Sequence, residues 1–296
     1  MNSKDFQQLI LSWWEKNRRD LPWRNTRDPY RIFVSEVMLQ QTQVDRVLPK
    51  YLEFIEAYPT VFELAGAALS DVITRWKGLG YNRRAVYLKK TAEAVVEKYG
   101  GTFPKTQEEL EKLPGIGKYT ASAICCFAYE QDVVVVDTNV RQIIEHFFFT
   151  PAPTQSSQLS DQPLSSSVDL TLTLSYKERG ITEKEVYDMA QQLVPKGKSW
   201  DWHQALMDYG SLALPKKKVS RKKEVFEESR RYFRGRIIDY LRTGEKKYVD
   251  IEKYFNDLNQ QSTKKYLFED VIKGLERDGL VATEGSGKTS IVRLPS

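Results

Sequence analysis

The fold is decided by the stretch Leu-Pro-Gly-Ile-Gly-Lys-Tyr-Thr at residues 113–120, which stands between two segments of helical spacing. Thr106 followed by Glu109 forms a capping box and predicts a helix that runs to Leu113. A second helix is predicted to begin near Lys118. The two glycines let the backbone come close to a ligand, and the free N–H groups of the second helix favour an anion. A DNA phosphate fits that role, although an ordinary tight turn between helices explains the same residues.

Outward from this turn, the sequence predicts an all-α domain. Asp28 is placed to cap a helix that starts at Pro29, and short glycine or proline turns separate the helices up to Phe149. Residues 150–176 are rich in Ser, Thr, Gln and Pro, which indicates an inserted surface loop. The helical pattern resumes at Thr182 and leads into a helix over residues 204–213.

The C-terminal part is predicted to be a separate unit. One helix contains Ile237, Ile238 and Leu241, a second covers residues 251–258, and a third covers residues 264–278. In the third helix the spacing places Leu267, Val271 and Leu275 on one face. Two alternating runs, residues 280–283 and 290–294, predict a β-hairpin. Three helices and a hairpin are typical of a winged helix, so the expected division is 1–214, a basic linker over 215–233, and 234–296.

Composition excludes several classes of protein. The chain has 296 residues, of which 41% are hydrophobic and 29% charged, which excludes disordered and collagen-like chains. The longest aliphatic run, residues 133–136, is far too short to cross a membrane, and the first five residues lack the pattern of a signal peptide. We therefore expect a cytoplasmic protein that is not secreted.

Cysteine and histidine are too few for a metal centre. The only cysteines are the adjacent Cys125 and Cys126, which cannot supply a disulfide framework or a four-thiolate site. His146 and His203 lack the spacing of metal ligands, so structural roles are expected for them. The sequence predicts no metal and no cofactor.

The net charge of +5 is concentrated in one segment. Residues 215–247 contain 13 basic and 5 acidic residues, a net of +8, so the rest of the chain sums to −3. Such a cluster attracts a polyanion by releasing counterions, although a solvated linker is an equally good explanation of the charge alone. The densest part consists of Lys216, Lys217, Lys218, Arg221, Lys222 and Lys223.

Two acidic residues are candidates for catalysis. Glu36 lies among apolar residues, and burial would raise its pKa and keep it able to donate a proton. An exposed helix glutamate is the alternative, and composition favours it. Asp137 could cap a helix, or it could stabilise an oxocarbenium-like transition state opposite a carboxylic acid. Sequence spacing alone does not decide between these roles.

Six ordered strings resemble MutY-type adenine DNA glycosylases of the helix-hairpin-helix superfamily, which implies a two-lobed, all-α glycosylase domain. The resemblance covers about residues 21–149 and 202–214. The strings are Leu-Pro-Trp-Arg (21–24), Ser-Glu-Val-Met-Leu-Gln-Gln-Thr (35–42), Gly-Leu-Gly-Tyr (78–81), Leu-Pro-Gly-Ile-Gly-Lys-Tyr-Thr (113–120), Asp-Thr-Asn-Val (137–140) and Gln-Ala-Leu-Met-Asp-Tyr-Gly (204–210).

The resemblance implies a role for each matching residue. It assigns protonation of a flipped purine, at N7, to Glu36, and stabilisation of the developing charge at C1′ to Asp137. Asn139 and Tyr119 would support this pair. The base pocket and the residues inserted into the duplex would comprise Arg24, Gln41, Tyr81 and Gln204, with Gln41 wedging into the stack and Tyr81 contacting the partner base. Contacts to DNA phosphates would come from Gly115, Gly117, Lys118 and the basic cluster.

The chain departs from the family in three ways. The four cysteines that hold an iron–sulfur cluster in typical relatives are replaced by the basic segment, to which we assign the DNA contact of the missing loop. The usual NUDIX-like C-terminal domain is replaced by the predicted winged helix. Thr138 stands where adenine-specific members have Gly, and residues 117–120 are similar to mismatch-specific thymine glycosylases as well.

These observations predict a monomeric, monofunctional adenine glycosylase acting on mispaired double-stranded DNA. Bifunctional relatives such as endonuclease III have a nucleophilic lysine where this chain has Tyr119, which cannot form a Schiff base. The expected target is adenine opposite 8-oxoguanine or guanine. The alternatives are a thymine or uracil glycosylase acting opposite guanine, and a catalytically idle DNA-binding protein.

Overall fold

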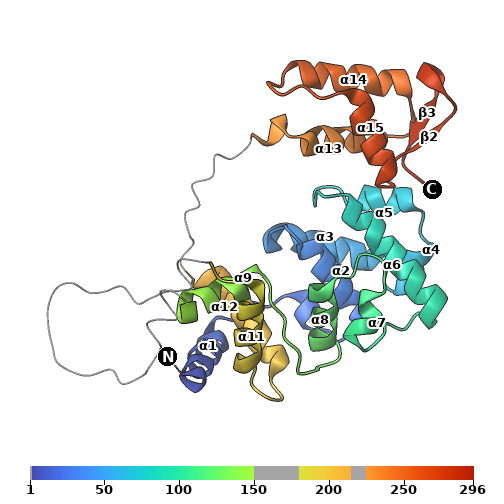
Figure 1. Cartoon of the computed structure of the whole chain (residues 1–296). Coiled ribbons are helices and arrows are strands. Elements are labelled where there is room, and N and C mark those ends of the chain that lie inside the picture. The colour runs from blue at the N-terminus through green and yellow to red at the C-terminus, as the bar shows by residue number, and fades with distance from the viewer. Residues whose placement is uncertain (1, 150–179, 215–224) are drawn as a thin grey trace, which may run out of the picture. The chain divides into compact units, whose positions relative to one another are not determined.

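A computed structural model describes residues 2–149, 180–214 and 225–296 (Figure 1). The chain divides into two compact units, one formed by residues 1–27 with 118–217 and the other by residues 28–117 with 218–296. The predicted insertion at 150–176 and the six cations between Lys216 and Lys223 lie outside the described residues. Within the described ranges, no helix is both long and apolar enough to cross a membrane.

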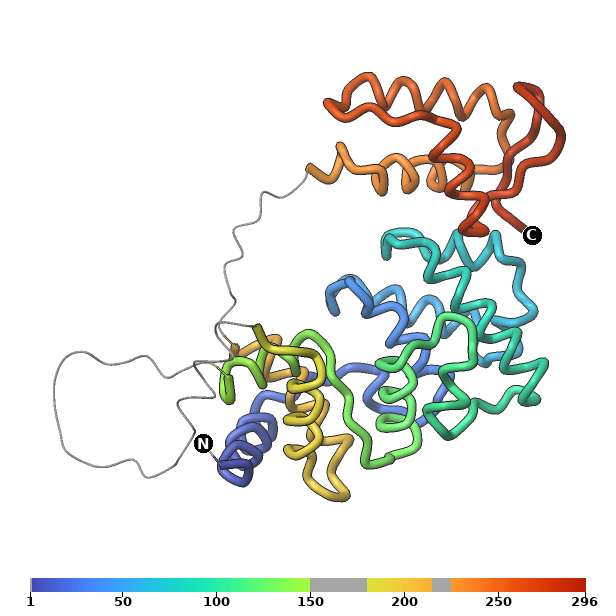
Figure 2. The backbone as a smooth tube through the Cα atoms, in the orientation of Figure 1, coloured from blue at the N-terminus to red at the C-terminus, as the bar shows by residue number. Residues whose placement is uncertain are grey.

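The first unit is a helical bundle built around one central helix. Helix α12 packs against α1, α8 and α9, and the backbone trace shows α1, from the N-terminus, running beside α12 (Figure 2). Phe6, Trp14 and Trp202 belong to its apolar core. Its helices are α1 (Ser3–Asn17), η1 (Pro22–Arg24), α8 (Lys118–Phe127), α9 (Thr138–Ile144), η2 (Glu145–Phe149), α11 (Glu183–Leu193) and α12 (Ser199–Leu212).

The predicted boundaries in this unit are largely confirmed. Thr182 caps α11 by accepting from the Glu185 N–H, so the helical pattern resumes where it was expected. Helix α12 begins at Ser199, five residues before the predicted start at Gln204, because the Trp-Asp-Trp-His stretch is helical and buries Trp202.

The second unit contains a six-helix part and the C-terminal domain. Asp28 caps α2 by accepting from the Tyr30 N–H at 2.9 Å, with Pro29 in the first helical position, as predicted. Helix α6 packs against α2, α4 and α5. The helices of this part are α2 (Pro29–Leu39), α3 (Val44–Ala57), α4 (Val61–Gly66), α5 (Leu69–Arg75), α6 (Arg83–Tyr99) and α7 (Gln107–Glu111).

The capping box predicted for α7 is only half formed. The Thr106 hydroxyl accepts from the Glu109 N–H, but the Glu109 carboxylate accepts from Tyr99 at 2.8 Å and from Lys112. The helix ends at Glu111, two residues before the expected Leu113. The buried Leu113 therefore belongs to the turn that follows.

The C-terminal domain has the predicted winged-helix arrangement. Within residues 225–296, three helices pack around Phe233 and Phe255, and an antiparallel sheet has the strand order β1-β3-β2. Strand β1 was not predicted, because two lysines show no alternation of apolar residues. The elements are η3 (Phe226–Glu228), α13 (Arg230–Leu241), β1 (Lys246–Lys247), α14 (Tyr248–Gln260), α15 (Phe268–Arg277), β2 (Ala282–Glu284), η4 (Gly287–Thr289) and β3 (Ile291–Arg293).

The helix predicted over residues 264–278 begins later than expected, at Phe268. Leu267 is the N-cap of α15 and is 71% exposed. Phe268, the first residue of the helix, is buried together with Val271 and Leu275.

The two glycines of the 113–120 turn have different constraints. Gly115 has φ +80°, and a Cβ there would lie 2.7 Å from Cβ of Tyr87. Gly117 has no such φ, and a Cβ there would meet no atom within 4 Å. Gly115 is therefore required by the fold, whereas Gly117 leaves open space beside the backbone just before α8.

We predict that Gly115→Ala lowers the free energy of unfolding by about 1–3 kcal/mol, since it adds left-handed strain and a collision with Tyr87. Gly117→Ala is the matched control and should stay within about 0.5 kcal/mol of the unsubstituted chain. Urea unfolding followed by circular dichroism measures both. Equal stability of the two variants would contradict this assignment.

Candidate active site

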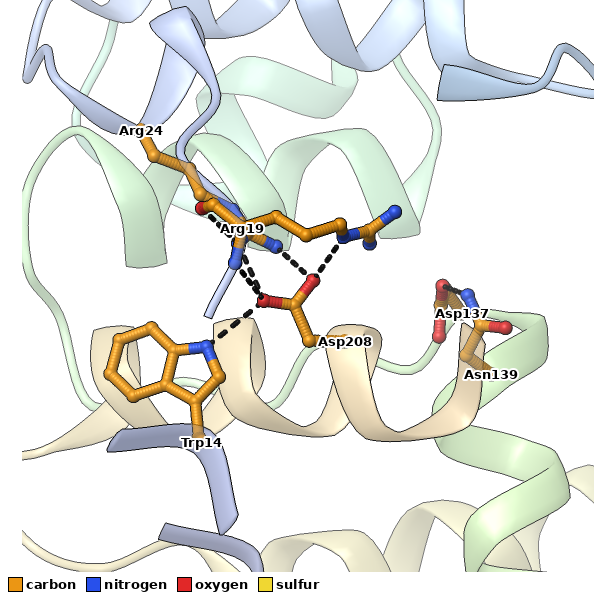
Figure 3. Close-up of polar contacts among 6 residues, drawn as sticks. All are labelled: Trp14, Arg19, Arg24, Asp137, Asn139 and Asp208. Atoms are coloured by element: carbon orange, nitrogen blue, oxygen red, sulfur yellow. Dashed lines mark hydrogen bonds and ion pairs between the residues drawn. The ribbon is translucent and has the colours of Figure 1, made fainter. Parts of the chain in front are cut away.

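Asp137 is held at the N-terminus of α9 by both carboxylate oxygens. Its Oδ1 accepts from the Val140 N–H at 2.7 Å, and its Oδ2 accepts from Asn139 Nδ2 at 2.9 Å (Figure 3). Burial raises the pKa of Asp137, and these hydrogen bonds act in the opposite direction. Asp137 is thus a helix cap, as one of the two interpretations predicts, and the cap fixes the carboxylate in one orientation.

His203 holds the segment that leads to Asp137. The buried imidazole accepts from the Val135 N–H at 3.0 Å through Nε2, which leaves Nδ1 to donate to the Ser199 carbonyl at 2.8 Å. The Ser199 hydroxyl donates to the Val133 carbonyl at 2.9 Å. The first turn of α12 therefore fixes the backbone just before Asp137, and the structural role expected for His203 is confirmed.

Gly210 brings α12 against the start of α9. A Cβ at Gly210 would lie 2.7 Å from Cβ of Asn139 and 3.2 Å from its Cα. A side chain there would displace Asn139, whose amide donates to Asp137. Gly210, which ends the 204–210 string, is therefore needed so that Asn139 can stay in place and bond to Asp137.

The buried carboxylate of Asp208, on α12, binds two arginines. Asp208 accepts from both terminal nitrogens of Arg24, at 2.7 and 2.9 Å, from Arg19 Nε at 2.6 Å and from Trp14 Nε1 at 3.0 Å (Figure 3). Burial alone would raise the pKa of Asp208, but the hydrogen bonds and charges of Arg24 and Arg19 outweigh it and lower the pKa. The Arg24 guanidinium, predicted to line the base pocket, is thus bound by Asp208.

Three further predicted residues lie on the same unit. Tyr119 is half-buried in the first turn of α8, Lys118 beside it is exposed, and Gln204 is buried on α12. Because α12 packs against α8 and α9, the helices that carry Tyr119, Asn139 and Gln204 are neighbours. In the sequence, Tyr119 and Gln204 are 85 residues apart.

Glu36 belongs to the second unit and is buried on α2. Its side chain lies in the helix face that also carries Phe33 and Val37, and the residue is 6% exposed. The alternative of an exposed helix glutamate is therefore wrong. A carboxyl group withdrawn from water in this way is suited to proton transfer.

The loops of Gln41, the predicted wedge, and Tyr81, the predicted contact to the partner base, are held by a residue that the sequence did not single out. Both have left-handed backbone conformations, with φ of 55° and 47°, and both are exposed. Arg84 is buried between their loops, and burial lowers its pKa to about 10. Its terminal nitrogens donate to the carbonyls of Val37 (2.7 Å), Met38 (2.9 Å), Gln40 (2.8 Å), Leu79 (2.9 Å) and Gly80 (3.1 Å) and to the Thr42 hydroxyl (3.0 Å).

The residues present do not fit an iron–sulfur cluster. Cys125 and Cys126 are the only two cysteines in the sequence, and both are buried in α8. Cys126 Sγ lies 3.4 Å from the Ser199 hydroxyl oxygen. Among the described residues, no group of three or more His, Cys, Asp and Glu side chains is placed to hold a metal ion.

Helices α7 and α8 are joined by the 113–117 glycine turn, so a mostly helical chain contains a helix-hairpin-helix arrangement. Residues 34–164 match the family model described as HhH-GPD superfamily base excision DNA repair protein. The chain is 31% identical over 216 residues to the thymine/uracil-DNA glycosylase of Methanothermobacter thermautotrophicus, covering 73% of this chain and 87% of that protein. The chain belongs to the HhH-GPD superfamily.

Adenine DNA glycosylases are also similar to this chain. The rat enzyme is 37% identical over 215 residues, which is 70% of this chain but only 37% of that protein. The chain thus spans little more than a third of the length of this relative. Among solved structures, a thermostable thymine-DNA glycosylase matches with a TM-score of 0.60 and 31% identity, over 73% of this chain and 89% of that one. The resemblance to MutY-type enzymes predicted from the six strings is confirmed.

We predict that His203 makes stability depend on pH. Burial lowers its pKa from 6.5 to about 4, so the folded chain favours the neutral ring and the unfolded chain takes up the proton first. This contribution is complete above pH 6.5 and is lost progressively as the pH falls toward 4. The unfolding free energy should drop by about 1 kcal/mol between pH 7.5 and 5.5 because of this residue.

Urea unfolding of the unsubstituted chain and of His203→Gln at both pH values measures the contribution. The variant should be less stable at pH 7.5, and the difference between the two proteins should shrink at pH 5.5. A constant difference would mean that His203 does not titrate as its burial requires.

Proposed function

We propose that this chain is a monofunctional DNA N-glycosylase that removes adenine mispaired with 8-oxoguanine or guanine. The observation that carries the proposal is the 37% identity to an adenine DNA glycosylase over 70% of this chain. The 46% identity to the adenine DNA glycosylase of Mycolicibacterium smegmatis over 136 residues supports the same substrate. The Asp137–Asn139 pair and the buried Glu36 supply side chains suited to the reaction.

In the proposed reaction the glycosidic bond breaks before water attacks. Glu36 donates a proton to N7 of the extruded adenine, so the electron pair of the C1′–N9 bond leaves with a neutral base. The Asp137 carboxylate stabilises the positive charge that develops on the sugar. Water then adds at C1′ and gives a proton to the Glu36 carboxylate, which restores the acid and leaves an abasic site.

The fixed orientation of Asp137 suits this role. Its carboxylate is positioned by the Val140 N–H and the Asn139 amide, so little reorganisation is needed as charge develops. Tyr119 offers no amine that could form a Schiff base with C1′. The product is therefore an intact strand with an abasic site.

Double-stranded DNA is the proposed partner of a monomeric chain. Gly115 and Gly117 would hold a phosphate at the start of α8 with Lys118, and the cations between Lys216 and Lys223 would add non-specific attraction. Gln41 and Tyr81 would enter the duplex at the vacated position. We propose that this chain does so without an iron–sulfur cluster, because its two cysteines are adjacent and buried.

A thymine or uracil glycosylase acting opposite guanine is the second candidate. The observation in its favour is coverage, because the Methanothermobacter thymine/uracil-DNA glycosylase aligns over 87% of its own length. Its identity of 31% is lower than the 37% found with the rat adenine enzyme over nearly the same number of residues. This comparison favours adenine.

Single-turnover excision on duplexes containing A:8-oxoguanine, A:G, T:G, U:G and A:T tests the proposal. We predict excision from the first two duplexes and strand breaks only after alkali, because the abasic product is not cleaved by a monofunctional enzyme. The A:T duplex is the control for background. Excision confined to T:G and U:G would replace adenine by the second candidate, and breaks without alkali would exclude a monofunctional reaction.

We predict that Glu36→Gln and Asp137→Asn each reduce excision by at least about a hundredfold, since each removes one charge or proton from the transition state. Asn is as good a helix cap as Asp, so Asp137→Asn should fold with nearly unchanged stability. DNA binding, measured by fluorescence anisotropy, should change little in either variant. Full excision by either variant would contradict the mechanism.

A further inference from the structure

The C-terminal domain contacts the six-helix part of its own unit through charged side chains. Arg242 of α13 donates to the Ile73 carbonyl at 3.0 Å, near the C-terminal end of α5, and its side chain is only 7% exposed. Asp278 pairs with Arg83 at 3.7 Å across the same contact. A cation against the last carbonyls of a helix is favourable. These contacts hold α13 beside the loop that carries Tyr81.

This contact places Arg231 on Tyr81. The guanidinium carbon of Arg231 lies 4.8 Å from the centre of the Tyr81 ring, and one terminal nitrogen donates to the Tyr81 hydroxyl. Arg84 lies 5.7 Å from the same ring, so Tyr81 contacts a guanidinium of each part of the unit. Both Tyr81 and Arg231 remain exposed.

We infer that Arg231 is a specificity-determining residue that contacts the base opposite the excised one. The inference rests on the proposed function, in which Tyr81 contacts the partner base. An exposed guanidinium that is already oriented by an aromatic ring loses little freedom when it binds a planar acceptor pair. Its preferred base is guanine, whose O6 and N7 accept two parallel hydrogen bonds.

The two partner bases of the proposed function differ at the atom that Arg231 would contact. Guanine N7 is an acceptor, whereas N7 of 8-oxoguanine carries a hydrogen and faces the guanidinium as a second donor. Arg231 should therefore favour guanine as the partner and contribute little with 8-oxoguanine. The winged-helix domain would thus contribute to the choice of partner base.

Single-turnover excision by the full chain tests this on A:G, A:8-oxoguanine and A:7-deazaguanine, the last of which lacks the N7 acceptor. Arg231→Ala should slow excision from A:G about tenfold and leave A:8-oxoguanine within about twofold. The unsubstituted chain should show the same loss on A:7-deazaguanine, with no further loss in the variant. Arg230→Ala is the matched control, because Arg230 is an exposed neighbour that bonds to the Asp270 carbonyl instead.

Two other results would overturn the inference. An equal loss of excision rate on all three duplexes would mean that Arg231 contacts a phosphate. A faster rate on all of them would mean that Arg231 blocks access to Tyr81. Failure of the proposed function is recognised separately, as absence of adenine excision by the unsubstituted chain. In that case the same variants on T:G and T:7-deazaguanine test Arg231, since the partner base is still guanine.

Discussion

The buried carboxylate of Asp208 ties together parts of the chain that are remote in sequence. It has no exposed surface, and it accepts from Trp14, Arg19 and Arg24, which lie 184–194 residues away. An ion withdrawn from water is tolerated only when its partners are all present, and loss of one partner leaves a buried charge without compensation. Helix α1 and the turn η1 are therefore fixed against α12 through one group.

The same helix positions the residues proposed for catalysis in its unit. On α12, Asp208 binds the arginines and Gly210 allows Asn139 to approach. His203 of the same helix fixes the backbone before Asp137. A shift of α12 would move all of these contacts together. The orientation of Asp137 thus depends on packing along the whole of α12. This dependence explains why the 204–210 string resembles the family although it includes no proposed catalytic acid.

Local chemistry made part of this structure predictable. Local residues are sufficient to predict three features, namely the caps at Asp28 and Thr182 and the glycine turn before Lys118, because each depends on residues a few positions apart. The burial of Glu36 could not be derived in this way, because composition favours exposure and only the packing of α2 against α3 and α6 removes water. Arg84 was missed, and the hydrogen-bond partners of His203 could not be derived, since some partners of these residues lie 42 and 68 residues away.

The left-handed residues Gln41 and Tyr81 are explained by the same long-range packing. A non-glycine residue in this conformation costs about 1–2 kcal/mol and persists only where its surroundings impose it. Arg84 imposes it on both loops at once, because its planar guanidinium binds carbonyls on either side. Under the proposed function, loops that have this shape before DNA binds lose less conformational freedom on binding, so more of the binding free energy remains to offset the unstacking of the target base. Under the proposed function, the buried Arg84 therefore influences extrusion of the base through the two loops that it holds.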